Sequence, residues 1–515
     1  IPFMKNKLYI AILIVAAQQV SAQVPEEALR LSWRPQMGTA RNQAIGGAMG
    51  SLGGDATANM VNPAGLAFYK TSDFVLTPAY QFGKGTSSFR GTSNTAADQN
   101  NFALGTSGFV FGGFGYKAKN SFGLTVTRVA DFRQTISYKG QNDYSSFAEP
   151  LADEFASSGL TIDEALNSGN VSLPTKMALF TYLVDTATIN GSKQVIARSE
   201  FTSLLNQEHL SEVSGGITEI TLGWGNEINK KFMAGISMGI PIVKIDRNTY
   251  YRESDASGDI DNDFNYMAYR ENFSLKGIGF NLKAGLIYRP KDYIRLGLAL
   301  HSPDMMMLTE TFKSGLAADL ENLFAPNTGY DSVASSIVAP NQTNEYKYTT
   351  YTPGKIILSG SYVFREVENI TRQKGFITAD IEFTNYKWMR FGPSGEVTDE
   401  TKAPYDPYND AIDAIYKTAV NFRIGGELKF KIIMARIGFA YYSSPYKDKV
   451  LKANKMNLSG GLGYRHKGMF LDLTYVHRIN KDVNFPYRVN APRANTFASL
   501  KETGGNVLLT VGFKI

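Results

Sequence analysis

The side chains best suited to general acid–base chemistry are four histidines: His209, His301, His466 and His477. None of them stands beside a recognisable serine nucleophile motif, and the absence of cysteine excludes thiolate catalysis. Asp259 begins the stretch DIDNDFN, which starts like a calcium-binding loop. Phe264, however, stands where that loop needs glycine, and Arg270 stands where it needs glutamate. We therefore expect no enzyme, no metal site and no cofactor.

Charged residues that alternate with apolar ones form a second chemically active set. In AVNFRIGGELKF, the even positions from Val420 to Phe430 are apolar or glycine, whereas the odd ones include charged residues. This period of two is typical of a β-strand with one apolar face. The same parity predicts that four cations point to the polar side, namely Lys283, Arg423, Arg436 and Arg478, together with the acids Asp380, Glu382, Glu427 and Asp472. We expect ion pairs among them, and a surplus arginine could bind a carboxylate, although parity does not select which one.

Fourteen segments with this period follow one another from about residue 73 to the C-terminus. Several of them are about 12 residues long, more than the 5 to 6 typical of soluble strands. Short turns alternate with long loops, which we place at residues 139–216, 248–268, 312–344 and 388–415. This pattern predicts an all-β fold, a 14-stranded antiparallel transmembrane β-barrel over residues 71–515.

The N-terminal residues predict export. A basic MKNK, the apolar run LYIAILIVAA and the small-residue end QQVSA together have the form of a signal peptide over residues 1–22. No other stretch reaches the ~18 apolar residues of a membrane-spanning helix. The net charge of +6 is too dispersed for a nucleic-acid partner. We expect a monomer in the outer membrane of a Gram-negative bacterium.

Residues 23–70 lack the strand period and end in GGDATANMVNPAGLAFYK. Asn62 can cap a helix start, and Pro63 suits the first helical position because it has no N–H to satisfy. Ala64 and Gly65 permit close packing against a neighbouring wall. Residues 23–70 are therefore predicted to form short turns and small helices, and the Asn-Pro-Ala triplet could be no more than a tight turn that leads into the wall.

With the barrel behind it, GGDATANMVNPAGLA resembles the corresponding run of FadL/TodX-type outer-membrane transporters of hydrophobic compounds, the long-chain fatty acid transporter family, in a Bacteroidetes-like form. TRVADFRQTISYKG is similar to the third strand of that family. The resemblance implies that residues 23–70 form a hatch. It also implies that loops capture the substrate, which is held beside the hatch and leaves sideways through a gap at the third strand.

The third strand carries a break in parity. Phe122, Leu124 and Val126 hold one face, and continuing it would place Arg128 against lipid at a cost of roughly 2 to 4 kcal/mol. A bulge would avoid this cost, and bulges interrupt pairing near functional sites. The predicted gate residues are Thr127, Arg128, Val129, Ala130 and Asp131. The alternative is that Arg128 extends its charge to the membrane interface.

Aromatic, leucine and methionine residues in the predicted loops, and in the stretch MMMLTETF that leads into the loop 312–344, are candidates for substrate capture, because such surfaces adapt to varied apolar ligands. They are Tyr250, Tyr251, Phe264, Tyr266, Met306, Met307, Leu320, Leu323 and Phe324. Packing among themselves to order the loops is the alternative. TKMALFTYLV has helical spacing and predicts a lid helix.

The predicted function is passive uptake of hydrophobic small molecules, such as long-chain fatty acids, with outer-membrane lipid as the surroundings. The alternative is a barrel of the same type that serves protein secretion or surface anchoring without lipid transport. Such a barrel needs neither a lateral gap nor an apolar tunnel.

Overall fold

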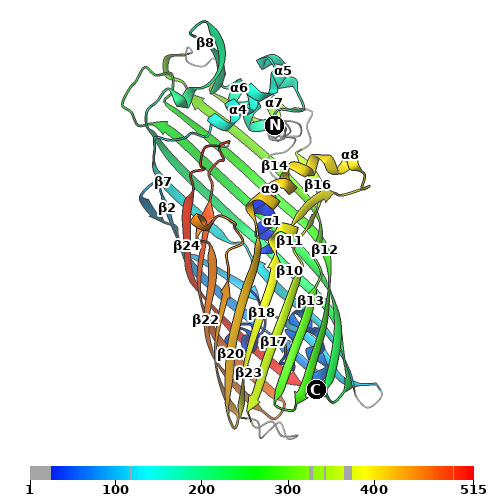
Figure 1. Cartoon of the computed structure of the whole chain (residues 1–515). Coiled ribbons are helices and arrows are strands. Elements are labelled where there is room, and N and C mark those ends of the chain that lie inside the picture. Colours follow the sequence, from blue (N-terminus) through cyan, green and yellow to red (C-terminus); the bar gives the residue numbers. More distant parts are fainter. Residues whose placement is uncertain (1–24, 116–118, 324–328, 341–343, 365–373, 491) are drawn as a thin grey trace, which may run out of the picture.

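The protein is a closed antiparallel β-barrel that contains its own N-terminal segment (Figure 1). A computed structural model describes residues 25–115, 119–323, 329–340, 344–364, 374–490 and 492–515. The predicted signal peptide, residues 1–22, lies outside these ranges. Within the described part of the chain, no helix is long and apolar enough to cross a membrane.

Fourteen strands form the wall, and six of them are interrupted. In chain order the wall segments are β1 (Asp73–Leu76) with β2 (Pro78–Phe89), β4 (Gln99–Leu104) with β5 (Ser107–Phe114), β6 (Asn120–Asp131) with β7 (Gln134–Asn142), β10 (Leu205–Asn229), β11 (Phe232–Asp255), β12 (Tyr266–Lys291), β13 (Ile294–His301) with β14 (Met305–Asp319), β16 (Glu345–Tyr351) with β17 (Lys355–Phe364), β18 (Gly375–Asn385) with β19 (Arg390–Pro393), β20 (Thr418–Phe430), β21 (Ile433–Tyr442), β22 (Asn454–His466), β23 (Met469–Asn484) and β24 (Ala498–Lys514). The barrel closes because β24 pairs with β23 on one side and with β1 and β2 on the other. The predicted fold class is confirmed.

The remaining elements belong to the hatch or to the end of the barrel that carries the long connections. The hatch contains α1 (Pro25–Ser32), α2 (Ala40–Ala44), α3 (Ala58–Val61) and η1 (Pro63–Phe68). The long connections contain β3 (Thr92–Thr95), α4 (Glu149–Ser158), α5 (Ile162–Asn167), α6 (Leu173–Phe180), β8 (Val184–Ile189), β9 (Ser192–Ala197), η3 (Arg198–Glu200), η4 (Glu321–Leu323), β15 (Ser332–Ala334), α7 (Ser335–Val338), η6 (Tyr386–Trp388), α8 (Asp399–Lys402), η7 (Ala403–Tyr405), α9 (Asp406–Ile415) and η8 (Lys449–Leu451).

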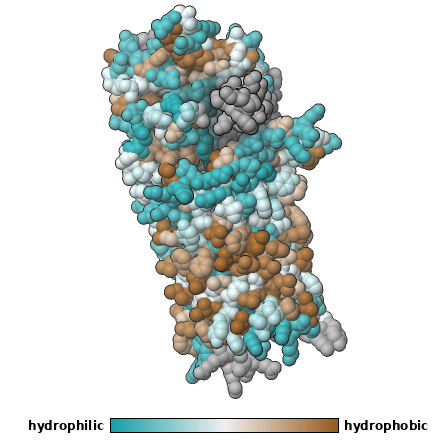
Figure 2. Space-filling model, in the orientation of Figure 1, coloured by the Kyte–Doolittle hydropathy of each residue, from teal (hydrophilic) through white to brown (hydrophobic). Residues whose placement is uncertain are grey.

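Alternation along each strand gives the wall an apolar outer face over part of its height. On β11, Ile236 and Ile242 are 49% and 44% exposed, whereas Met233 and Val243 on the opposite face are buried. Figure 2 shows a brown apolar zone over the lower half of the molecule and a mostly teal surface above it. An apolar band of this kind on a closed barrel faces lipid. From Lys244 upward the outer face of β11 is polar, so its membrane-spanning part ends near Ile242.

The wall is much taller on one side than on the other. β10, β11 and β12, here called the tall wall, have 25, 24 and 26 residues, whereas β20, β21 and β22 have 13, 10 and 13. Three predicted loops are therefore too long, because their ends are strand: 139–216 shrinks to 143–204, 248–268 to 256–265, and 312–344 to 320–344. The fourth, 388–415, includes β19 and extends to residue 417. Above the bilayer both strand faces can be polar, so the apolar alternation that reveals a strand is lost.

The hatch contacts the inner face of the wall around much of its circumference. α2 packs against β21, β22, β23 and β24, and η1 packs against β10, β11 and β12. Nearly all hatch residues between Pro25 and Tyr69 are buried or half-buried. In Figure 1, α1 lies at mid-height of the barrel, beside α9. The predicted N-terminal hatch is thus part of the observed fold.

Candidate functional site

The Asn-Pro-Ala motif both starts η1 and fastens it to the wall. Asn62 is the N-cap, since its side-chain oxygen accepts a hydrogen bond from the Ala64 backbone N at 3.1 Å, and Pro63 is the first residue of the helix. Asn62 Nδ2 donates to the Gly50 carbonyl within the hatch (2.6 Å) and to the Leu286 carbonyl of β12 (3.3 Å). The motif therefore turns the chain and also anchors the hatch.

Glycines on the wall make room for this anchor. A Cβ atom on Gly285 would lie 1.8 Å from Asn62 Oδ1, and one on Gly235 would lie 2.3 Å from the Pro63 carbonyl carbon. A Cβ atom on Gly65 would lie 2.8 Å from the Cβ of a residue in α3. Backbone and small side chains touch directly here, which explains the concentration of small residues in residues 53–70.

Buried ion pairs hold the lumen together, and they include three of the four predicted inward cations. The pairs are Lys283 with Glu219 (2.6 Å), Arg423 with Glu382 (2.9 Å) and Arg436 with Asp472 (2.6 Å). Asp380 accepts hydrogen bonds from the backbone N of Met49 (3.1 Å) and of Gly50 (3.2 Å), so it fixes the hatch directly. Parity predicted the direction of these side chains correctly, but not their partners.

A cavity of about 610 Å³ lies between the start of the hatch and the wall. Leu29 and Trp33 line it from the hatch side, and Phe82 of β2 lines it from the wall. Residues 129–134, at the junction of β6 and β7, line it as well. Phe147, in the connection between β7 and β10, also lines it. The cavity therefore extends from the end with the long connections to the third strand.

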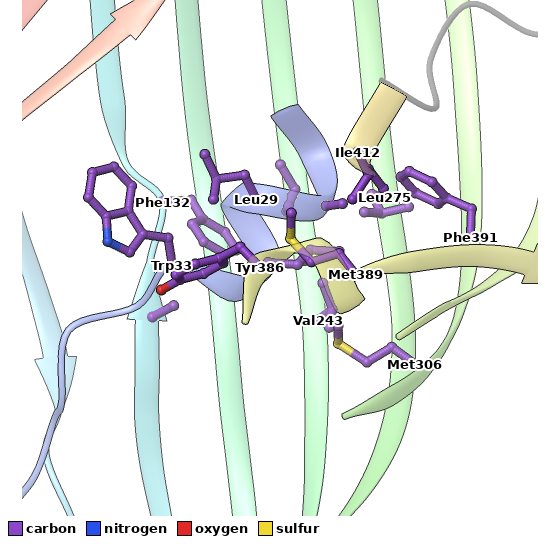
Figure 3. Close-up of a cluster of buried hydrophobic side chains, with 14 of the residues drawn as sticks. Leu29, Trp33, Phe132, Val243, Leu275, Met306, Tyr386, Met389, Phe391 and Ile412 are labelled. Carbon is purple, nitrogen blue, oxygen red and sulfur yellow. The ribbon is translucent and has the colours of Figure 1, made fainter. Parts of the chain in front are cut away.

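Apolar side chains surround the hatch helix at this cavity (Figure 3). Leu29 and Trp33 belong to the same cluster as Phe132 of the third strand. The other labelled members come from the wall and from the connection around α9: Val243, Leu275, Met306, Tyr386, Met389, Phe391 and Ile412. Of the labelled residues, Leu29, Trp33 and Phe132 also line the cavity, whereas Met306 and Met389 are fully buried outside its lining. The cluster therefore gives the cavity an apolar wall at the hatch helix.

The fourth predicted cation, Arg478, faces this cavity. Its nearest carboxylate contact is at 3.9 Å, between Nη2 and Glu502, and its buried Nε has no hydrogen-bond partner among the described residues. Lys455, also in the lining, is already engaged, because its Nζ donates to the Trp33 carbonyl at 2.7 Å and lies 4.1 Å from the centre of the indole ring. Of the four predicted inward cations, Arg478 thus has the longest ion pair.

The third strand has a register shift in the predicted region. Against β10, Ala130 pairs with Ile217 and Arg128 with Thr218, so Val129 is the extra residue. The shift does not turn Arg128 away from the outer face, because Arg128 still follows Val126 at the same parity and its side chain is 24% exposed. The expectation that a bulge would remove this charge from the outside is wrong. Instead Asp131 lies 3.7 Å from Arg128 Nε and balances it.

On its other side the third strand is incompletely paired. β5 pairs with β6 only up to Ser107 and Val126. Above Val126, no backbone ladder joins β4 to β6 anywhere in the described ranges; β4 pairs with β2. Side chains span the join, with Asn101 donating to Asp131 Oδ2 and Arg133 donating to the Asn100 carbonyl. We call this join, between residues 99–104 and 127–133, the seam.

The nine predicted capture residues do not form one exposed surface. Four are buried in apolar clusters, namely Tyr251, Phe264, Met306 and Leu320, and Leu323 is partly buried against one of these clusters. Three lie on the outer face of the wall: Tyr250, Tyr266 and Met307. Phe324 lies outside the described residues. The prediction of an exposed groove is wrong for the buried four, which pack against their neighbours, and only Tyr251 of the described eight lines the cavity.

Residues 143–204 dock on the tall wall through a buried polar network. The Glu253 carboxylate accepts hydrogen bonds from Tyr251 Oη (2.7 Å), Gln207 Nε2 (2.8 Å) and the Phe147 backbone N (2.8 Å). Glu253 lies eleven residues beyond Ile242 and so outside the membrane-spanning part of β11. Burial raises the pKa of the Glu253 carboxyl to about 7.

Several cavity residues carried no usable sequence signal. Trp33 follows a short helix, and its role depends on where the hatch places that helix. Phe132 lies in the break between β6 and β7, and Asn101 lies in the short strand β4, which has too little apolar alternation to give a direction. Lys455 shares its strand with few charges, so parity alone did not single it out. Proximity in the folded barrel, rather than spacing in the chain, unites them.

No protein-family model matches the chain, and no curated protein is similar to it in sequence. Solved structures do match. A FadL homologue from Pseudomonas aeruginosa aligns over 94% of this chain and 99% of its own, with 14% identity and a TM-score of 0.54. The toluene transporter TodX of P. putida aligns over 93% of this chain and 99% of its own, with 12% identity and a TM-score of 0.52. The chain therefore has the fold of the FadL and TodX barrels.

Proposed function

We propose that this barrel lies in the outer membrane of a Gram-negative bacterium and carries hydrophobic small molecules passively inward, without catalysis. The fold is shared with a protein named as a FadL homologue and with one named as a toluene transporter. The apolar outer band and the hatch support a plugged membrane channel rather than an open pore.

The proposed route starts at the end of the barrel with the long connections, passes through the cavity and leaves sideways at the seam. One observation carries it: the same cavity is lined by the hatch and by residues 129–134, next to the seam, where no backbone ladder joins β4 to β6 among the described residues. An apolar ligand in this cavity needs to displace only side chains to reach lipid.

Long-chain fatty acids are the proposed substrate class. The cluster around Leu29 and Phe132 can receive an acyl chain, and Arg478 can receive a carboxylate through charge-assisted hydrogen bonds. A pure hydrocarbon would leave Arg478 without an anionic partner. The presence of both features in one cavity favours an amphiphile.

A reversible cross-link tests the route, because the chain has no native cysteine. The double variant N101C/D131C places two thiols across the seam. After oxidation, uptake of a radiolabelled fatty acid into cells should fall to the level of cells that lack the protein, and reduction should restore it. The matched control is L458C/H477C, which joins directly opposed residues of the fully paired β22 and β23. Undiminished uptake by the oxidised seam variant would overturn the lateral route.

Mass spectrometry of the purified barrel tests transport against the secretion or anchoring alternative. A transporter should retain an apolar or amphiphilic molecule from the cell, and the substitution G65V should reduce the retained amount by disturbing the hatch. If neither protein retains such a molecule, a barrel that binds a protein partner is favoured.

A further inference from the structure

Three lysines lie in one row across the outer face of the barrel. Lys244 of β11 is paired directly with Lys276 of β12. Lys276 is paired with Thr309 of β14, which is paired in turn with Lys347 of β16. All three lysine side chains are exposed. Like charges directly opposite each other destabilise a sheet, so this row calls for an external anion. We name Lys244, Lys276 and Lys347 the lysine row.

The lysine row lies at the upper edge of the apolar band. Two residues below it on their strands, Ile242, Ile278 and Met307 form an adjacent outward row and are 44%, 47% and 52% exposed. Above the lysine row, the outer face is polar. The lysines therefore stand where hydrocarbon gives way to headgroups, and an anion bound there can carry its acyl chains along the apolar row below.

The acidic neighbours do not satisfy this charge. Lys244 lies 3.3 Å from Asp246, and Lys347 lies 3.3 Å from Glu345, but exposed pairs of this kind contribute little. Above the apolar band, the outer faces of β10, β11, β12, β14 and β16 carry six cations, Lys244, Arg252, Arg270, Lys276, Lys313 and Lys347, and five carboxylates, Glu208, Glu212, Asp246, Asp319 and Glu345. Glu208 is directly opposite Arg252. The cations exceed the carboxylates by one, and the carboxylates of β10 lie away from the lysine row.

Two arginines extend this surface upward. Arg252 lies over the ring of Tyr266 at 5.0 Å, and Arg270 lies over the ring of Tyr250 at 5.4 Å, all on the outer face of β11 and β12. A guanidinium over an aromatic ring can still donate its N–H groups to phosphate or carboxylate groups. A ligand with anionic groups at more than one height fits this face better than a simple phospholipid does.

We propose that the lysine row binds the phosphate groups of a phosphorylated, acylated saccharide in the outer leaflet, with its acyl chains on Ile242, Ile278 and Met307 and its further anionic sugars near Arg252 and Arg270. This inference rests on the proposed outer-membrane location and not on the transport route. The tall wall thereby acts as a lipid-binding surface as well as part of the barrel.

Titration of the purified, detergent-solubilised barrel with phosphorylated lipid A tests the proposal. The triple variant K244S/K276S/K347S should weaken binding at least tenfold and reduce the co-purifying phosphorylated glycolipid seen by native mass spectrometry. The charge-conserving K244R/K276R/K347R should retain binding. Retained migration of the unheated protein as a folded barrel on gels shows that neither variant is unfolded.

The control variant K193S/K402S/K449S removes three exposed lysines from the long connections and should bind like the unaltered protein. Equal losses in both serine variants would overturn the proposal by assigning the effect to total charge. Dephosphorylated lipid A that binds as tightly as the phosphorylated form would overturn it as well. Displacement by millimolar inorganic phosphate alone would assign the row to a free anion instead. Uptake assays are independent of all these readouts, so failure here leaves the transport proposal untouched.

Discussion

Arg478 offers a direct test of the substrate's headgroup. Substituting R478Q should weaken binding of a long-chain fatty acid about tenfold, since a hydrogen bond to a charged group contributes roughly 1.5 to 3 kcal/mol. A fatty alcohol of the same chain length should bind both proteins alike. Fluorescence titration of the detergent-solubilised barrel measures both affinities. An equal loss for acid and alcohol would mean that the substitution damages the cavity and that Arg478 holds no carboxylate.

Gly285 tests the contact between hatch and wall. The substitution G285A forces a Cβ atom against Asn62 Oδ1, so we expect a loss of about 1 to 3 kcal/mol in the free energy of unfolding and a leak of polar dye into vesicles. G360A is the matched control, because a Cβ atom there meets nothing within 4 Å. Unchanged permeability in G285A would indicate that the hatch tolerates displacement at this point without opening the bore.

Individual side chains were predictable where one face of a strand is lipid-facing. Period two alone directs Lys283, Arg423 and Arg436 inward, as observed. Continued even parity would place Phe132 on the same face as Val126, but Phe132 is buried beside Leu29 and Trp33 because the strand breaks there. The prediction that Tyr251 and Phe264 are exposed rested on composition and is wrong. Composition reveals that a segment is apolar but not whether other parts of the chain cover it.

Glu253 makes the docking of residues 143–204 sensitive to pH. Its folded pKa of about 7 lies above the unfolded value of 4.5, so its contribution to stability is full below about pH 4.5 and is lost as the pH rises through 7. The loss is on the order of 3 kcal/mol. Hydrogen exchange of residues 143–204 should therefore quicken between pH 5 and 8, after correction for the intrinsic exchange rate. E253Q should exchange with the same corrected protection at both values; a persistent pH effect in E253Q would assign the titration to another group.

Strand number and order followed from the sequence, whereas strand length did not. The centres of all fourteen predicted segments fall within or beside observed wall strands. The upper ends of β10, β11 and β12 were missed because water faces both the outer surface and part of the lumen there, so no hydrophobic alternation is required. The break between β6 and β7 was visible only as a parity error, which located the irregularity at Val129 but not the unpaired neighbour.

The position of the whole barrel in the bilayer can be measured by placing charge on its surface. I437R puts a cation at an outward position on β21 that is 67% exposed within the apolar band, and it should destabilise the protein in phospholipid vesicles by roughly 2 to 4 kcal/mol. N248R, on the polar outer face of β11, should change the free energy of unfolding by less than about 0.5 kcal/mol. Similar costs at the two positions would contradict the proposed membrane boundary.

The architecture as a whole was the most predictable property. Apolar residues alternate along each strand, and short turns alternate with long loops, so both patterns repeat along the chain. The cavity was the least predictable. It combines a hatch helix, a strand junction and a lumen cation that lie hundreds of residues apart, and nothing local in the sequence marks their meeting. Similarity to a FadL homologue and TodX shows the barrel fold but not the ligand.

The seam is held by a few side-chain hydrogen bonds and not by a backbone ladder. Separating its two sides therefore breaks far fewer hydrogen bonds than separating two paired strands would. Each of these partly solvated hydrogen bonds contributes about 0.5 to 1.5 kcal/mol. Losing a few of them leaves an open seam close enough in free energy for thermal motion to populate it at about the per cent level. On the proposed route, opening the seam would need neither nucleotide hydrolysis nor an ion gradient, and net transport would run toward the side on which the substrate is consumed.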